Sequence, residues 1–332
     1  MSEDVFPGAQ GHLTWNEVLR ALAWAAPLTS GQLRRIVAPR MDPANFARRV
    51  LTPMEKLGLI AMIDYHYSEA RGHRNPAKRI PPRRIGRVWQ IGNRGFADIQ
   101  ADPSSPKKPA IVRPSLLAHD VMTGEVITRV VEWTRPFLSA IYVEHEERLD
   151  DARRKPIADA MLVVRYDREV SGKTVPWKSA PPGPTEDIRF YAVEMDRNTE
   201  EYKITDEKAV NYRTVRNDPT FYERFGPMFP APLIIVPSET RLQRWHAGWK
   251  ERWPYGVWLI TTDERLARDE WLEFSSGSER WRTFTDGWKP PASSQAASAA
   301  PGTTRSDGVG TTATAATPSK PRSWLEDPRI PR

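Results

Sequence analysis

Residues 30–63 read SGQLRRIVAPRMDPANFARRVLTPMEKLGLIAMI, and this stretch decides the fold of the first part of the chain. Its opening serine, a capping residue, predicts a short helix at residues 30–37, and apolar residues at helical spacing predict a second helix at residues 43–57. Gly58 is the residue type that most often ends a helix, because it adopts the left-handed conformation without strain. The apolar residues 59–63 that follow predict a strand.

The second of these helices has one apolar side and one exposed polar side. It is expected to begin with Asp42 as its N-cap and Pro43 at its first position, where proline loses nothing by lacking an N–H. Its apolar side is Phe46, Val50, Met54 and Leu57, and the opposite side carries Arg48, Arg49, Thr52 and Lys56. Pro53 conflicts with a regular helix at a cost of about 3 kcal/mol, so we expect a kink or a break at Thr52.

The flanking segments complete a winged helix. A helix is expected at residues 15–25, after Thr14 as its N-cap, and a strand at residues 88–91 pairs with the strand at residues 59–63. Between the two strands, residues 71–87 contain seven Lys or Arg residues and no acid. Three helices, a strand, a basic loop and a strand form a winged helix, in which one helix enters a DNA groove.

This arrangement predicts double-stranded DNA as a partner. The exposed side of the helix would contact the groove, and the basic loop would bind phosphates in a salt-sensitive manner that does not depend on sequence. The predicted DNA contacts are Arg48, Arg49, Thr52, Lys56, Arg71, Arg74, Lys78, Arg79, Arg83, Arg84 and Arg87. The alternative for this region is a small helical module that binds another protein.

The expected fold class of the chain is α+β or α/β, and its second part has the pattern of helices and strands packed in one domain. The expected elements are a helix at 115–133, strands at 139–143, 158–166 and 188–195, a helix at 206–215, a strand at 233–236, a helix at 239–251 and a strand at 256–261. The order αβββαβαβ predicts a mixed sheet with helices packed on it. Trp245, Trp249 and Trp253 recur every four residues, which favours packing on the sheet over base stacking.

Acidic residues lie near the ends of two of these strands. Asp159 lies near the start of one strand, and Glu194 and Asp196, two apart and therefore on one face, lie at the end of the next. Lys208 and Tyr212 share one side of the following helix. If the strands are neighbours, the three carboxylates would bind one Mg²⁺ or Mn²⁺ ion, and Lys208 would stabilise charge on an attacked phosphate. The alternative is a set of solvated ion pairs.

Four short motifs carry these residues: Leu117-Ala118-His119-Asp120, Ile157-Ala158-Asp159-Ala160, Glu194-Met195-Asp196-Arg197 and Lys208-Ala209-Val210-Asn211-Tyr212. They resemble motifs of the replication-relaxation family of bacterial plasmids and other mobile elements. The resemblance spans roughly residues 13–260 and implies a winged helix joined to a nuclease-like domain.

That second domain is in turn similar to the restriction-endonuclease-like superfamily, whose core is αβββαβ. The superfamily's site is an Asp, followed by an acid-x-Lys on the next strand. By this resemblance Asp159 and Glu194 are the two acids, Asp196 stands in the lysine position, and Lys208 is placed to replace that lysine. His119 would lie near the site, although a structural, hydrogen-bonded histidine is the alternative.

Composition sets further limits. The 332-residue chain has a net charge of +7, which suits a polyanionic partner, and it has no cysteine, which excludes disulfides, zinc fingers and thiol chemistry. No apolar run approaches the roughly 20 residues that span a bilayer, and the first residues lack a signal-peptide pattern. We therefore expect a cytoplasmic protein with no membrane partner.

The predicted organisation has five parts: a disordered N-terminus at 1–12, a winged-helix domain at 13–101, a linker at 102–114, a nuclease-like domain at 115–288 and a disordered low-complexity tail at 289–332. The tail ends in a candidate docking peptide, residues 323–326, for a protein partner.

The leading hypothesis is a DNA-binding protein of a plasmid or mobile element that nicks or cleaves DNA with Mg²⁺ or Mn²⁺ during replication or transfer. Two rivals stay open: a non-catalytic replication or transfer accessory factor, and a transcriptional regulator whose second domain senses a ligand. A single three-carboxylate metal site requires Asp159, Glu194 and Asp196 to lie within about 5 Å of one point.

Overall fold

The structure is a computed structural model, and it describes residues 8–25, 27–63, 87–100, 117–137, 140–148, 157–167, 186–196, 202–225 and 228–288. The expected linker, most of the expected basic loop, residues 168–185 and the expected tail lie outside these residues, so the predicted domain boundaries stay predictions. In the part that the structure describes, no helix has the length and apolar character needed to cross a membrane.

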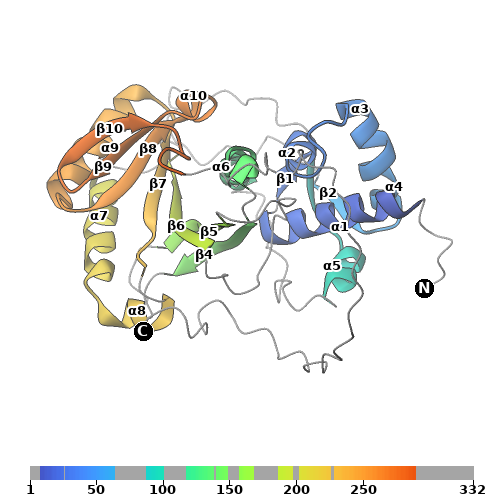
Figure 1. The fold of residues 1–332 in the computed structure, drawn as a ribbon, viewed down its shortest axis with the longest axis horizontal. Helices are drawn as coiled ribbons and strands as arrows, with labels where there is room; N and C mark the ends of the chain where they lie inside the picture. Colours follow the sequence, from blue (N-terminus) through green and yellow to red (C-terminus); the bar gives the residue numbers. More distant parts are fainter. Residues whose placement is uncertain are drawn as a thin grey trace, which may run out of the picture.

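The first part of the chain is a winged helix (Figure 1). Its helices are α1 (Gly8–Ala25), α2 (Ser30–Val37), α3 (Pro43–Phe46), a π-helical turn η2 (Ala47–Leu51), α4 (Thr52–Lys56) and α5 (Asn93–Ile99). Its strands are β1 (Leu28–Thr29), β2 (Ile60–Ile63) and β3 (Val88–Ile91), which form an antiparallel sheet in the order β1-β3-β2. The predicted helices and strand pair are confirmed, and α5 is an addition.

Two of the predicted helix starts are wrong. The helix α1 begins at Gly8, so it includes residues 8–12 and contains Thr14 within it rather than at its N-cap. The N-cap of α2 is Thr29 and not Ser30, because the Thr29 side chain accepts from the Gln32 N–H while the Gln32 side chain accepts from the Thr29 N–H. The predicted N-cap at Asp42 is confirmed by its bonds from Ala44 and Asn45.

The irregularity expected before Pro53 is a π-helical turn. In η2 the Thr52 N–H bonds to the Ala47 carbonyl, one residue further back than in an α-helix. Pro53 then lies in the first turn of α4, where a missing N–H costs least. The wider turn therefore accommodates the proline without ending the helix, and Gly58 closes it with φ of 69°.

The second part is built on one seven-stranded mixed sheet in the order β10-β9-β8-β7-β6-β5-β4. The strands are β4 (Ala140–Arg148), β5 (Ile157–Asp167), β6 (Glu186–Met195), β7 (Ala231–Val236), β8 (Val257–Thr262), β9 (Trp271–Ser275) and β10 (Ser278–Arg282). The helices are α6 (Leu117–Thr134), η6 (Arg135–Phe137), α7 (Tyr202–Arg216), α8 (Pro219–Phe225), α9 (Glu239–Arg252) and α10 (Asp263–Leu266).

Apart from the short helices η6 and α8, the elements from α6 to β7 follow the predicted αβββαβ order. Strands β4, β5 and β6 are antiparallel neighbours, and β7 and β8 continue the sheet in parallel. The fold is therefore α+β, as the sequence predicts. The hairpin of β9 and β10 and the short helices α8 and α10 are additions.

The sheet is covered on both faces, and alternate residues of β5 divide between two cores. Leu162 and Val164 belong to the core that includes α6, whereas Met161 and Val163 belong to the core that includes α7 and α9. The predicted packing role of the three tryptophans is confirmed, because all three are buried. Trp249 and Trp253 pack against Trp258 of β8, and Trp245 stacks on Trp249.

The helix α6 lies between the winged helix and the sheet (Figure 1). One continuous core joins Leu22 and Leu28 of the winged helix to Val126 and Val130 of α6 and to Leu162 of the sheet. The two parts of the chain therefore pack as neighbours.

Candidate active site

A cluster of polar residues lies where β5 begins and β6 ends. Ala160 is paired with Val193 in the antiparallel register of these strands, so Asp159 and Glu194 are the next residues along each strand. Opposite residues of an antiparallel pair project from the same face, and that face of the sheet is the one that α7 covers. We name His119, Asp159, Glu194, Lys208 and Tyr212 the β5–β6 site.

Asp159 is held by contacts from two sides. The Nε2 atom of His119, in the first turns of α6, lies 3.3 Å from Asp159 Oδ1, and the Met195 N–H donates to Oδ2 at 2.8 Å. Burial alone would raise the pKa of Asp159, but the contacts with His119, the charge of Lys208 and the Met195 N–H outweigh it and lower that pKa below its ordinary value. Asp159 is therefore ionised at neutral pH.

Glu194 is a fully buried carboxylate with a partner on each oxygen. Lys208 Nζ lies 2.8 Å from Oε2, and the Tyr212 hydroxyl donates to Oε1 at 2.7 Å. Burial raises the pKa of Glu194 to about 7, with Lys208 opposing the shift and the charge of Asp159 adding to it. Glu194 therefore changes protonation state near neutral pH.

His119 carries the compensating positive charge. Its Nδ1 atom lies 3.2 Å from Asp120 Oδ1, and its Nε2 atom faces Asp159. Burial lowers the pKa of His119, but the two carboxylates raise it more, to about 9. At neutral pH the ring is protonated, so both nitrogens donate and fix the position of Asp159.

Asp196 has a different environment. Its side chain is buried, and its Oδ2 accepts from Arg241 Nε at 2.5 Å and from the Trp245 indole N–H at 2.8 Å, both on α9. Glu194 instead faces α7. The structure therefore brings Asp159 and Glu194 together with Lys208, Tyr212 and His119, but it directs Asp196 to a buried ion pair.

The donor set fits a cation held by two carboxylates rather than three. Within the described ranges, no three or more His, Asp or Glu side chains are placed to hold one metal ion. Asp159 and Glu194 are both oxygen donors, and Mg²⁺ is commonly bound by one or two carboxylates together with substrate phosphates. Any metal at this site would use Asp159 and Glu194, and Asp196 would support the helix α9.

The predicted DNA contacts are described only in part. Arg48, Arg49 and Lys56 are exposed and Thr52 is half-buried on the segment from η2 to α4, and Arg87 is exposed beside β3. Arg48 donates to Asn45 Oδ1 at 3.0 Å, which leaves its side chain along the surface of the helix. Arg71, Arg74, Lys78, Arg79, Arg83 and Arg84 lie outside the described residues.

Sequence reasoning missed two residues of this region. Arg241, the partner of Asp196, follows a strand by a few residues, and no local pattern distinguishes it from a surface arginine. Asp120 was visible beside His119 in the first motif, and an acid next to a histidine is a signal that could have identified it.

Comparison with known proteins bears on the whole arrangement. A family model described as replication-relaxation matches residues 19–226, which is more than half of the 332-residue chain and includes the winged helix from within α1 onward and all five residues of the β5–β6 site. No curated protein and no solved structure matches the chain. The family match, together with the winged helix and the αβββαβ core, shows that this chain belongs to the replication-relaxation family.

Proposed function

We propose that this replication-related protein binds double-stranded DNA through its winged helix and hydrolyses a phosphodiester bond at the β5–β6 site. One observation carries the proposal: Lys208 of α7 contacts Glu194 of β6, next to Asp159 of β5. Two acids on neighbouring strands with a lysine beside them can hold a divalent cation and neutralise charge on an attacked phosphodiester.

Each residue of the site has a chemical role in this proposal. Lys208 is partly exposed and would neutralise charge on the attacked phosphate. Glu194 has a pKa of about 7 in the metal-free site, and a divalent cation would hold it ionised as a carboxylate ligand. His119 holds Asp159, and Tyr212 holds Glu194, so both carboxylates are kept in one orientation. A divalent cation bound by Asp159 and Glu194 would supply the charge that polarises the phosphodiester.

A second candidate function is a DNA-binding factor without hydrolysis, acting in replication or transfer. It is favoured by the complete burial of Glu194, both oxygens of which already accept hydrogen bonds. In that case the cluster would stabilise the domain and the protein would only hold DNA.

The test is a nicking assay with the full chain and supercoiled plasmid in Mg²⁺ or Mn²⁺. The expected result is nicking that requires the metal and is lost in Asp159→Asn and in Glu194→Gln. The control is Asp269→Asn, because Asp269 is a half-buried carboxylate outside the site whose removal should leave nicking intact. DNA binding without nicking, equal in all four proteins, would establish the non-catalytic factor instead.

A further inference from the structure

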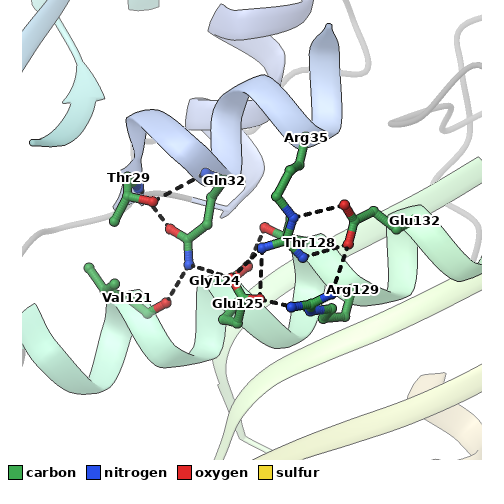
Figure 2. Close-up of polar contacts among 9 residues, drawn as sticks. All are labelled: Thr29, Gln32, Arg35, Val121, Gly124, Glu125, Thr128, Arg129 and Glu132. Carbon is green, nitrogen blue, oxygen red and sulfur yellow. Dashed lines mark hydrogen bonds and ion pairs between the residues drawn. The ribbon is translucent and has the colours of Figure 1, made fainter. Parts of the chain in front are cut away.

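A polar clamp joins the winged helix to α6 (Figure 2). Arg35 of α2 bonds to two glutamates that lie about two turns apart on the same face of α6. Its Nη1 lies 2.8 Å from Glu125 Oε1, and its Nε lies 2.8 Å from Glu132 Oε1. Gln32, one turn earlier on α2, donates to the Val121 carbonyl at 2.9 Å and to Glu125. We name Gln32, Arg35, Glu125, Glu132 and Arg135 the α2–α6 clamp.

The clamp also caps a helix end. Arg135, just after α6, donates to the carbonyls of Arg35 and Ile36 at 2.9 and 2.8 Å. These carbonyls belong to the last turn of α2, where main-chain acceptors lack partners within the helix. Both the side and the end of α2 are therefore bound to the second part of the chain.

The charges in the clamp are mutually compensated and partly shielded from water. The side chains of Arg35, Glu125 and Glu132 keep only 20–25% of their surface exposed. Two glutamates hold one guanidinium in a fork, the geometry in which arginine is a much stronger partner than lysine. Gly124 lets the two parts approach closely, since a Cβ there would lie 3.2 Å from the Pro27 carbonyl.

The helix α6 is shared between the two functions that the molecule combines. Its clamp side holds α2, which packs against α3 at the start of the exposed Arg48 segment. Its first turns carry His119, which contacts Asp159, and its apolar residues Val126 and Ile127 lie in the core that includes β5. A continuous helix thus connects the DNA-facing segment to the β5–β6 site without a flexible joint between His119 and Arg135.

We propose that Arg35 is a positioning residue that holds the DNA-facing segment of the winged helix at one fixed distance from the β5–β6 site. The protein then acts on DNA at a constant offset from the sequence that the winged helix binds. The fixed distance rests on the clamp and on the core that it borders, and not on the proposed function, whereas the constant offset rests on the proposed function. Two experiments keep these parts separate.

The first experiment measures the distance without DNA. The chain has no cysteine, so Glu55→Cys on α4 and Glu207→Cys on α7, both exposed, give a clean pair of spin labels. Pulsed electron paramagnetic resonance should give one narrow peak in the distribution of distances between the two labels, and adding Arg35→Ala should broaden that peak or add further peaks. The matched control is Arg129→Ala, because Arg129 contacts the same Glu125 and Glu132 from within α6 and its loss should leave the peak narrow.

A broad distribution in the parent pair, or a peak that Arg35→Ala leaves unchanged, would overturn the proposal. If Arg35→Ala fails to fold, Arg35→Lys keeps the charge and removes the fork, and it should broaden the peak to a smaller extent. A circular-dichroism melt of each variant identifies variants that have lost the fold.

The second experiment reads the offset on DNA and does not need the protein's own chemistry. An iron chelate on Glu207→Cys, one residue before Lys208, produces radical cuts wherever α7 lies on a bound duplex. The winged-helix footprint on the same end-labelled duplex gives the reference point. The cuts should fall at one offset, and Arg35→Ala should spread them over neighbouring positions while the footprint stays in place. A single unchanged offset in Arg35→Ala would overturn the proposal, and this result stands whether or not the protein nicks DNA itself.

Discussion

Lys208 Nζ lies 2.8 Å from Glu194 Oε2, and this contact joins α7 to the end of β6, beside Asp159 of β5. The glutamate has no exposed surface, so its charge depends on the partners that α7 provides. Tyr212, one helical turn after Lys208, provides the second partner. The stability of this part of the fold is therefore coupled to the protonation of one buried carboxylate.

Tyr212→Phe should lower the free energy of unfolding by about 1.5–3 kcal/mol, because it removes a buried hydrogen bond to a charged group and leaves the ring in place. Urea denaturation measures this. The control is Tyr222→Phe, whose hydroxyl donates to the neutral Arg216 carbonyl in a partly buried position and should cost about 0.5–1.5 kcal/mol. Equal losses in the two variants would contradict the view that Tyr212 supports a buried charge.

Glu194 should make the protein less stable as the pH rises from about 4.5 to about 7. In the folded protein its pKa is about 7, whereas the unfolded value is 4.5, so within this window the folded state holds a proton that the unfolded state has released. The free energy of unfolding then falls with rising pH, and Glu194→Gln should remove that part of the slope in urea denaturation. A slope that survives the substitution would contradict the assignment.

His119 should also make the protein less stable as the pH rises, but in a higher pH window. Its pKa is about 9 in the folded protein against 6.5 unfolded, so its contribution is fully present below pH 6.5 and is lost as the pH rises to about 9. His119→Gln should flatten the stability curve in this window. Asp269→Asn is the comparison. Burial raises the pKa of Asp269 only to about 6, so this substitution should change the slope of stability with pH below pH 6 and leave the window from 6.5 to 9 unchanged.

Much of the fold could be predicted because the patterns were local. The N-cap at Asp42, the helix end at Gly58 and the alternation along β5 are decided by neighbours in sequence. The start of α1 and the cap of α2 were misplaced, since Thr14 lies inside a helix that begins at Gly8 and Ser30 is the first residue of a helix that Thr29 caps. Thr29 and Ser30 are both good capping residues, and the Gln32 side chain completes a capping box with Thr29.

The site could be predicted only as far as strand register allowed. Asp159 and Glu194 fall opposite each other because β5 and β6 are antiparallel neighbours, and the lysine four residues before Tyr212 follows from helix geometry. Asp196 shares a strand end with Glu194, but it faces Arg241, and no sequence spacing relates a residue of β6 to one of α9. The α2–α6 clamp was missed for the same reason, since its partners are about 90 residues apart.

Breaking the Asp196–Arg241 pair should be far more damaging than replacing both residues. Arg241→Met removes the charged partner of a buried carboxylate that still accepts from Trp245, which should cost about 3–5 kcal/mol. Asp196→Asn with Arg241→Met removes the charge and keeps an acceptor for Trp245, so most of that loss should be recovered. A double-mutant cycle by urea denaturation measures this coupling, and simple additivity of the two changes would contradict it.

Gly124→Ala should destabilise the junction between α6 and the winged helix. Its Cβ would lie 2.9 Å from Leu28 Cδ2 and 3.2 Å from the Pro27 carbonyl, so the backbones must separate, at about 1–3 kcal/mol. Gly31→Ala on α2 is the control, since only Thr29 Oγ1, at 3.9 Å, lies near the new methyl group and the helix gains about 0.5–1 kcal/mol. Thermal denaturation that moves both variants in the same direction would contradict this difference.

DNA binding should depend on Arg48 and Arg49 through phosphate contacts. Both side chains are exposed on the helical segment that the proposed function places in a DNA groove, and each phosphate neutralised adds about 0.9 to the slope of log Kobs against log salt. The double variant Arg48→Ala with Arg49→Ala should therefore bind duplex DNA more weakly and with a slope smaller by up to about 2. The matched control removes two other exposed arginines, Arg268 after α10 and Arg280 on β10, which pair with glutamates of the second part of the chain. Fluorescence anisotropy over a salt series measures both slopes, and an equal change in the two double variants would show that net charge, rather than the winged-helix surface, governs binding.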